Sequence, residues 1–337
     1  MDESLDPSII AVLQVGCKVI SVTPHGKGSW SAGYKVDVDV NGEEKEYFVK
    51  WQILYGNNHQ EMALGEYESQ KELAKYLPDN VIVPLAHGTL ENDPSASFYL
   101  TTFRNLSDRT PQPAQLVEVL EKLHNNSLSP NGKFGFHVTT FNGVMPIVHD
   151  WCDTWEEYFA RQLQFDIKWE QSIRGADPEF DAVADEFFQR VIPRLLRPLE
   201  TGGRSIKPSL VHGNLWHGNA QIDMATQHLM LFDSCCCYAH NEFDLGMMRQ
   251  PRYRFTGEHA DRYREVIRPS EPVEDFDDRN ALYAMHDNLI NSGLHEHRAF
   301  LRGQVKEEMQ RLIAKHPNGI DGSNAGSMYL IPRKRIG

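Results

Sequence analysis

The sequence lacks any long, uncharged apolar stretch. No hydrophobic run among its 337 residues approaches the roughly 20 residues that a membrane-spanning helix needs. The first 14 residues include the acids Asp2, Glu3 and Asp6 and no extended apolar core, so neither a secretory signal nor a transit peptide is indicated. We therefore expect a cytoplasmic protein that does not act at a membrane.

Cysteine is scarce and irregularly placed. The chain has five cysteines, and three of them are adjacent at Cys235, Cys236 and Cys237. This arrangement excludes a regular disulfide framework, and it does not have the spacing of a zinc site. We expect reduced cysteines that are buried as small hydrophobic residues.

Positive charge is also in deficit. Lysine and arginine number 34 against 47 aspartates and glutamates, which gives a formal net charge of -13. Proteins that bind a nucleic acid backbone usually carry a basic surface, so no nucleic acid partner is expected. An acidic surface is compatible with cationic or neutral substrates, and it also serves solubility alone.

The N-terminal part of the chain predicts a small β-rich lobe. Runs rich in β-branched and aromatic residues predict strands at residues 18–22, 33–40 and 46–51. Asn41 and Gly42, between the last two runs, are a strong hairpin signal. A helix over residues 61–76 and strands over residues 82–88 and 97–103 complete this lobe.

The rest of the chain is predominantly helical. Helices are predicted over residues 114–125, 155–172, 180–199, 282–294 and 300–315, and short apolar strands over residues 210–213 and 229–233. A β-rich lobe followed by a helical lobe is the order of a two-lobed, protein-kinase-like α+β fold. We place the N-terminal lobe at residues 1–103, the C-terminal lobe at 104–316 and a flexible tail at 317–337.

The most specific chemical signal is a loop that begins His212-Gly213-Asn214. Asn219 follows within the loop, and an apolar strand then ends at Asp233. In a kinase, the residue at position 214 orients the acceptor hydroxyl and accepts its proton, while Asn219 and Asp233 bind a magnesium ion that bridges the phosphates. Their oxygens suit such a hard cation. Turn chemistry explains each residue alone, but their order along the chain favours phosphoryl transfer.

The β-rich lobe supplies candidates for phosphate binding. Gly26 and Gly28 form a Gly-x-Gly turn between the first two strands, where backbone amides can approach a phosphate closely. Lys50 ends the third strand, where a phosphate-pairing lysine is expected, and the following helix offers several acids to hold it. An ordinary hairpin turn, a solvated lysine and solvent-facing acids are the alternatives.

The chain resembles the fructosamine kinase (ketosamine 3-kinase) family, a branch of the aminoglycoside phosphotransferase-like kinases. The likeness extends from about residue 50 to residue 312. It rests on the block at residues 210–219 and on four others, at residues 134–137, 150–161, 232–233 and 238–245. Because these blocks occur in the family's order, they favour the kinase-like fold.

The resemblance implies that ATP, with magnesium, phosphorylates a sugar hydroxyl of a ketosamine that is free or protein-bound. Lys50 then pairs with the phosphates and Glu66 orients Lys50. The implied nucleotide and metal sites comprise Gly26, Gly28, Lys50, Glu66, Thr102, Phe103, Asn219 and Asp233. We expect a monomer. The Gly-rich loop has no cysteine, so the regulatory disulfide of some family members is not expected.

Four residues are candidates for substrate contact: Trp216, His217, His240 and Glu242. The first two lie where the family's catalytic loop meets its substrate, and core packing is the alternative for an aromatic residue there. His240 and Glu242 line the sugar site or have a structural role. His124, near the end of the helix predicted at 114–125, is expected to be a packed histidine.

Asn214 departs from the family, which usually has aspartate at this position. An amide cannot accept a proton, and a positioned general base contributes about a hundred- to ten-thousand-fold in rate. Three explanations are open: the asparagine was introduced deliberately, the chain is a pseudokinase that binds without transferring phosphate, or another group such as His217 or Glu242 acts as the base. A small-molecule kinase with a different acceptor is a further alternative.

Overall fold

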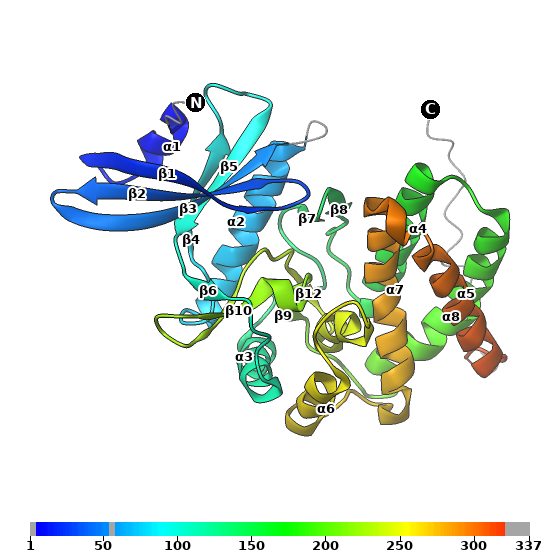
Figure 1. Ribbon diagram of the computed structural model, residues 1–337. Coiled ribbons are helices and arrows are strands. Elements are labelled where there is room, and N and C mark those ends of the chain that lie inside the picture. The colour runs from blue at the N-terminus through cyan, green and yellow to red at the C-terminus, as the bar shows by residue number, and fades with distance from the viewer. Residues whose placement is uncertain (1–4, 54–57, 321–337) are drawn as a thin grey trace. The chain divides into compact units, whose positions relative to one another are not determined.

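The computed structural model describes residues 5–53 and 58–320 (Figure 1). Its contacts divide the chain into two compact units. Unit 1 is Met1–Trp151 with Pro208–Arg268, and unit 2 is Cys152–Lys207 with Pro269–Gly337. The N-terminal part contains a large sheet and the C-terminal part is mainly helical, so the predicted α+β class is confirmed. The lobe boundary after residue 103 stays a prediction, and most of the predicted tail lies outside the described residues.

Unit 1 contains a five-stranded antiparallel sheet with the strand order β1-β2-β3-β5-β4. Its strands are β1 (Cys17–Lys27), β2 (Ala32–Val40), β3 (Glu43–Ile53), β4 (Pro84–Thr89) and β5 (Ala96–Thr102). The predicted hairpin is confirmed, because Asn41 and Gly42 join β2 to β3 with φ angles of 57° and 89°. Positive φ at both central residues is what a type I′ turn requires.

A short N-terminal helix, α1 (Pro7–Val12), packs on this sheet (Figure 1). Val36, Val38 and Val40 alternate along β2 and are buried in the same cluster as Ile9 of α1. This period of two is typical of a strand with one face on a core. Asp6 caps α1 and also accepts hydrogen bonds from the amides of residues 91 and 92, which ties the helix to the β4–β5 connection.

The predicted helix over residues 61–76 is α2 (His59–Tyr76). It packs against β7 (Thr140–Asn142), which pairs with β8 (Met145–Ile147). The approach is close at Gly65, where an added Cβ would lie 2.6 Å from the carbonyl oxygen of Thr139. Only glycine fits there, so the position of α2 is fixed one residue before Glu66.

The remaining elements of unit 1 surround the loop at residues 212–219. One small sheet pairs β9 (Ser209–Val211) with β12 (Cys237–Ala239), and another contains β6 (Leu106–Ser107), β10 (Ala220–Asp223) and β11 (Leu229–Leu231). The helices here are α3 (Pro113–Asn126), α6 (Gly257–Val266), and the 3-10 helices η2 (His217–Asn219) and η3 (Asn241–Arg249). The three adjacent cysteines are free and buried, as predicted.

Unit 2 is helical. Its helices are α4 (Trp155–Arg174), α5 (Pro178–Leu196), α7 (Phe276–Leu294) and α8 (Leu301–Lys315), with the 3-10 helices η1 (Arg197–Glu200), η4 (Val273–Asp275) and η5 (Glu296–Arg298). All four long helices were predicted, but α7 begins earlier than residue 282, and the helix predicted to end at residue 199 changes to η1 after Leu196. Within the described residues, no helix has the length and apolar character to cross a membrane.

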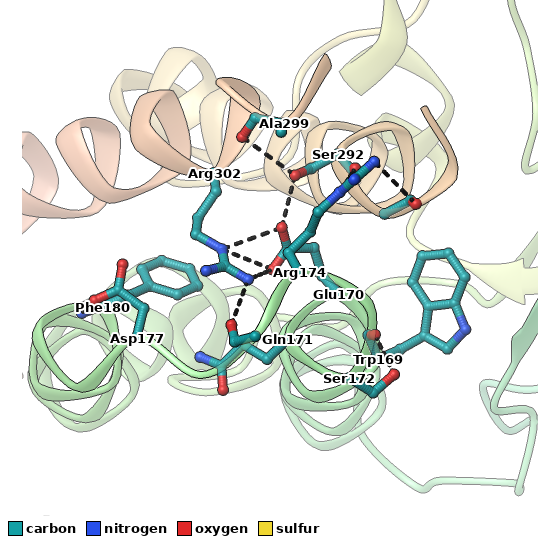
Figure 2. A network of polar contacts seen from close by, with 12 residues as sticks. Trp169, Glu170, Gln171, Ser172, Arg174, Asp177, Phe180, Ser292, Ala299 and Arg302 are labelled. Carbon is teal, nitrogen blue, oxygen red and sulfur yellow. Dashed lines mark hydrogen bonds and ion pairs between the residues drawn. The ribbon is translucent and has the colours of Figure 1, made fainter. Parts of the chain in front are cut away.

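A buried carboxylate joins three helices of unit 2 (Figure 2). Glu170 of α4 is 0% exposed, and its oxygens accept hydrogen bonds from Arg302 of α8 at 2.5 to 3.1 Å and from Ser292 Oγ of α7 at 2.6 Å. Arg174 in turn donates to the carbonyl oxygen of Ser292. A buried charge that is fully hydrogen-bonded fixes the relative positions of α4, α7 and α8.

Candidate active site

Lys50 of β3 joins two carboxylates in unit 1. Its Nζ lies 2.8 Å from Glu66 Oε2 and 2.5 Å from Asp233 Oδ1. Burial lowers the pKa of Lys50, but the two carboxylates outweigh burial and raise the pKa above its ordinary value. Lys50 is therefore a fixed positive charge at neutral pH, and the structure brings together three of the residues that sequence reasoning selected.

Asp233 remains accessible although it is paired. It follows β11 with a φ of 54°, in the left-handed region that aspartate and asparagine enter more readily than other non-glycine residues. Its side chain is 45% exposed. Desolvation raises its pKa, and the ion pair with Lys50 outweighs this effect, so the pKa lies below its ordinary value. The carboxylate is thus ionised, and it is open to a further partner.

Amide hydrogen bonds close the loop at residues 214–219 onto Asp233. Asn219 Nδ2 lies 3.0 Å from the carbonyl oxygen of Asn214 and 3.3 Å from that of Asp233. This leaves Oδ1 as the ligand atom of Asn219. Asn214 Nδ2 also donates to the carbonyl oxygen of Asp233, at 3.3 Å. An ionised aspartate at position 214 has no hydrogen to donate to that carbonyl.

The backbone of the loop is set by Gly213 and His212. Gly213 has a φ of 77°, and an added Cβ would lie 2.2 Å from the carbonyl oxygen of Cys235. His212 is buried; its Nε2 donates to the carbonyl oxygen of Phe232, while its Nδ1 accepts the amide of Asn214. Burial lowers the pKa of His212, so the neutral ring that this bonding pattern requires is the stable form.

Asp244, which sequence reasoning identified only as part of a family block, anchors this loop. Its carboxylate accepts the amides of His212 and Gly213 at 2.9 and 3.0 Å. His124 Nε2 lies 3.2 Å from the same carboxylate, and His124 Nδ1 lies 2.7 Å from the hydroxyl of Tyr263. His124 is buried, as expected, and it also bonds to the loop's anchor. Tyr263 lies on α6, which the sequence pattern did not reveal.

The two glycines of the Gly-x-Gly turn differ. Gly26 has a φ of 84°, and an added Cβ would meet nothing within 4 Å, so its backbone is accessible. The amide of Gly28 donates to the carbonyl oxygen of Ser31 at 2.9 Å, which closes the turn between β1 and β2. That amide is therefore already bonded. Phosphate binding by Gly26 and Gly28 stays a prediction.

Thr102 and Phe103 lie at the end of β5. The Phe103 amide donates to the carbonyl oxygen of Glu46, and the rings of Phe103 and His25 meet edge to face with centroids 4.8 Å apart. Together with residues of β2 and β3, Thr102 and Phe103 line a hollow of about 510 Å³. Their assignment to the nucleotide stays a prediction.

Trp216 and His217 belong to an aromatic group on the loop. The Trp216 ring lies over Gly218, where an added Cβ would come within 2.3 Å of it, and it is 5.7 Å from the Tyr253 ring. His217 Nδ1 accepts the amide of Arg254 at 3.1 Å. This bond occupies the acceptor nitrogen of the neutral ring, so His217 offers a donor at Nε2 and not a base.

His240 and Glu242 are both buried, at the start of η3. Their side chains approach each other, with 3.9 Å between His240 Nε2 and Glu242 Oε1. Their contact with the substrate stays a prediction.

The donor set fits a nucleotide with magnesium. Magnesium is usually held by one or two carboxylates together with substrate phosphates, not by a complete cage of side chains. The Asp233 carboxylate and Asn219 Oδ1 are oxygen donors of the required type, and Lys50 lies on the same carboxylate. In the described parts of the chain, no group of three or more His, Cys, Asp or Glu residues could hold a metal.

The fold is that of kinase-like phosphotransferases. A putative fructosamine-3-kinase from Thermobifida fusca matches with a TM-score of 0.70 and 18% identity, over 92% of this chain and 100% of that chain. A thermostable mutant of the aminoglycoside phosphotransferase APH(4)-Ia, solved in a ternary complex with AMP-PNP and hygromycin B, matches with a TM-score of 0.58 and 12% identity, over 92% of this chain and 98% of that chain. At these identities the likeness shows the fold alone.

The sequence comparison is more specific. A family model described as fructosamine kinase matches residues 8–315. The chloroplastic protein-ribulosamine 3-kinase of Oryza sativa subsp. japonica is 28% identical over 284 residues, which are 82% of this chain and 76% of that protein. The chain belongs to the fructosamine kinase family, and it is an enzyme of the phosphotransferase class. The predicted family and fold are confirmed, whereas the roles of individual site residues stay predictions.

Proposed function

We propose that the protein binds ATP with magnesium in unit 1 and transfers a phosphate to a sugar hydroxyl of a ketosamine, slowly because Asn214 replaces the base. The observation that carries this proposal is the contact of Lys50 with both Glu66 and Asp233. Membership of the fructosamine kinase family and the similarity to a protein-ribulosamine 3-kinase support the choice of acceptor.

The residues to which we assign phosphate and magnesium binding lie close together. Lys50 is hydrogen-bonded to Asp233 and can donate to phosphate oxygens instead when a nucleotide binds. Glu66, whose side chain is 10% exposed, keeps the ammonium group of Lys50 in position. Asp233 and Asn219 Oδ1 would hold magnesium, which neutralises charge on the phosphates when bound. Because the pKa of Asp233 is lowered, no proton has to leave this ligand at neutral pH.

The acceptor side of the site differs from the phosphate side. Asn214 Nδ2 is bonded to the Asp233 carbonyl, so Asn214 Oδ1 is the atom that can accept a hydrogen bond from the acceptor hydroxyl. This bond would orient the hydroxyl without removing its proton. The proton would then leave to the phosphoryl oxygens or to water, at the cost of the rate that a base contributes.

The second candidate is a member of this enzyme family that still binds nucleotide but has lost the transfer of phosphate. The bond from Asn214 Nδ2 to the Asp233 carbonyl favours it, because the loop makes use of the amide that replaces the family's aspartate. The two candidates share nucleotide binding and differ only in turnover.

Comparing the wild-type chain with Asn214→Asp tests the proposal. ATP turnover is measured with a fructosamine and with a ribulosamine acceptor, and Asn214→Ala serves as the control that removes the amide without adding a base. We expect Asn214→Asp to increase turnover about a hundred- to ten-thousand-fold over the wild type, and Asn214→Ala to give no increase.

The alternatives predict other results. No gain in Asn214→Asp, with nucleotide binding intact, contradicts the kinase proposal and favours the non-transferring protein. Turnover with an aminoglycoside but with neither ketosamine would identify a different acceptor. If ATP with magnesium does not bind and Lys50→Ala changes nothing, both candidates are rejected.

A further inference from the structure

The segment around Asp233 is held on both sides. Before it, the Phe232 amide donates to the carbonyl oxygen of Asn219 at 3.2 Å; after it, the Cys235 amide donates to the carbonyl oxygen of His212 at 3.1 Å. Between these points Asp233 adopts its left-handed backbone conformation. Such a conformation persists when the surrounding structure fixes it, so the groups that contact residues 231–236 determine where the carboxylate lies.

One buried side chain of α2 contacts this segment on both sides of Asp233. Gln70 is 0% exposed. Its Nε2 donates to the carbonyl oxygen of Leu231 at 3.2 Å and to that of Ile82 at 3.3 Å. Its Oε1 accepts the Ser234 hydroxyl at 2.7 Å. Gln70 therefore connects a residue before Asp233 with the residue directly after it.

The neighbouring Ser69 extends the same contact. Its Oγ accepts the amide of Cys236 at 3.1 Å, and both residues are fully buried. Ser69 and Gln70 lie three and four residues after Glu66, which puts all three on one face of a helix. One face of α2 thus presents Glu66 to Lys50 and binds the backbone around Asp233.

We propose that Gln70, supported by Ser69, is a positioning residue that holds Asp233 at a fixed place relative to Glu66 and thereby tunes the affinity for magnesium. Its amide is the group that can link these two positions, because it both donates and accepts within one side chain. Removing it takes the Gln70 amide from the buried Ser234 hydroxyl and leaves the Leu231 carbonyl with only the longer bond from the Ile82 amide, at 3.4 Å, so the segment is held less firmly. The inference rests on the proposed function in that Asp233 is a magnesium ligand.

Asn80 provides a matched control. Its Nδ2 donates to the carbonyl oxygen of Leu229 at 2.9 Å, and its own carbonyl accepts the amide of Leu231. Asn80 therefore donates a side-chain amide bond to a carbonyl of β11, as Gln70 does. Among the described contacts, however, Asn80 has none with the residues that come after Asp233 in the chain. Asn80→Leu removes a side-chain amide from the strand and leaves the Gln70–Ser234 bond intact.

The test compares Gln70→Met, which preserves length and helix preference, with Asn80→Leu and the wild type. The affinity for a non-hydrolysable ATP analogue is measured by calorimetry in magnesium and again in EDTA. The quantity compared is the ratio of the affinity in magnesium to the affinity in EDTA. We expect this ratio to fall about tenfold in Gln70→Met, which is the low end of what the loss of an outer-shell partner costs in metal affinity. Binding in EDTA should change little, and Asn80→Leu should keep the full response to magnesium.

Ser234→Ala keeps the inference testable if Gln70→Met fails to fold. It deletes the other half of the same bond with the loss of one oxygen, and it should lower the magnesium response in the same direction. Where both variants fold, the double variant should lose scarcely more than Gln70→Met alone, since Gln70→Met already removes the bond to Ser234. Additive losses, or equal losses in Gln70→Met and Asn80→Leu, would overturn the inference.

The failure of the inference differs from that of the proposed function. If the wild type tightens with magnesium and Gln70→Met does so equally, only the positioning role is wrong. If the wild type shows no response to magnesium, the proposed function fails, and amide hydrogen exchange then tests the positional part alone. Exchange at residues 232–236 should be faster in Gln70→Met than in Asn80→Leu, and equal rates would overturn the inference.

Discussion

Asp233 in unit 1 and Glu170 in unit 2 are both carboxylates paired with a cation, but they have different surroundings. The Glu170 side chain is 0% exposed, and both of its oxygens accept bonds from Arg302, one of them also from Ser292. The Asp233 side chain is 45% exposed, and its Oδ1 bonds to Lys50. The first carboxylate is saturated with partners, whereas the second is accessible to a further one.

The difference separates a structural ion pair from a functional one. A saturated buried carboxylate cannot take a new ligand without breaking several bonds, and its partners hold helices together. A half-exposed carboxylate can exchange its partner cheaply, because water can replace Lys50 on the exposed side. A carboxylate close to a cation is therefore not by itself evidence of a functional site. Whether the carboxylate is accessible to a further partner is more informative.

The largest effect is expected from breaking the structural pair. Arg302→Met leaves Glu170 as a buried charge without its cation, which should lower the free energy of unfolding by about 3–5 kcal/mol. Urea denaturation measures this loss. Lys306→Met, on the same helix but in an exposed pair with Glu179, is the control and should leave stability unchanged. Nucleotide affinity should be unaltered in both variants. A large loss of nucleotide affinity in Arg302→Met would contradict the distinction between a structural and a functional ion pair.

Breaking the ion pair of Lys50 with Asp233 should reduce nucleotide affinity more than stability. Lys50→Met removes the charge expected to meet the phosphates, which should weaken ATP binding by about 2 kcal/mol, the size of a charge-assisted hydrogen bond. The free energy of unfolding should fall by less than in Arg302→Met, because Asp233 is 45% exposed and can be solvated, and Glu66, at 10% exposed, is less completely buried than Glu170. Calorimetric titration measures the affinity, and Lys71→Met, an exposed lysine on α2, is the control. Unchanged affinity in Lys50→Met would show that the pair is merely structural.

Asp244 extends the comparison of buried and exposed carboxylates within unit 1. The effect expected from changing it, on the pH dependence of stability, is the smallest of the three. Like Glu170, it is buried and its oxygens are engaged, by the amides of His212 and Gly213 and by His124. Burial raises its pKa, but these bonds outweigh burial and place the pKa below the ordinary aspartate value of 3.8.

The sign of the pH effect follows from this lowered pKa. The unfolded chain binds the proton first as pH falls, so the stabilisation by Asp244 is complete above the ordinary pKa and is lost as pH falls through the folded value. We expect the free energy of unfolding to decline below about pH 3.8 more steeply in the wild type than in Asp244→Asn. Thermal unfolding between neutral pH and pH 2 measures the slopes, and parallel slopes would contradict the assignment.

The fold was predictable where local patterns were long. Runs rich in β-branched and aromatic residues and an Asn-Gly turn predicted the hairpin of β2 and β3, and long helical patterns predicted α4 and α5. α1 has six residues, too few for a helical period to be recognised. α7 is buried on almost every side, so its first turns showed no apolar stripe against a polar face and its start at Phe276 was missed.

The candidate site was predictable only where residue type and order along the chain were sufficient. Lys50, Asn214, Asn219 and Asp233 stood out because a kinase needs those groups in that sequence. Gln70 did not, since an isolated glutamine has no pattern, and Asp244 was indicated only as part of the family block at residues 238–245. Gln70 is separated from its partner Leu231 by 161 residues, and no local signal reports such a distance.

The sequence by itself determined the family, the order of a β-rich part before a helical part, and the chemical groups available, including the amide that replaces a carboxylate at position 214. The residues of α2 alone left open which acid meets Lys50, and the family resemblance implied Glu66. Only the tertiary structure decided how all the acids of α2 are partnered: Glu66 meets Lys50, while Glu68 pairs with Lys71 and Glu72 with Lys75 and Tyr238. The physical reason is that the direction of a side chain on a helix is fixed by what packs around it, and here those partners come from distant segments of the chain.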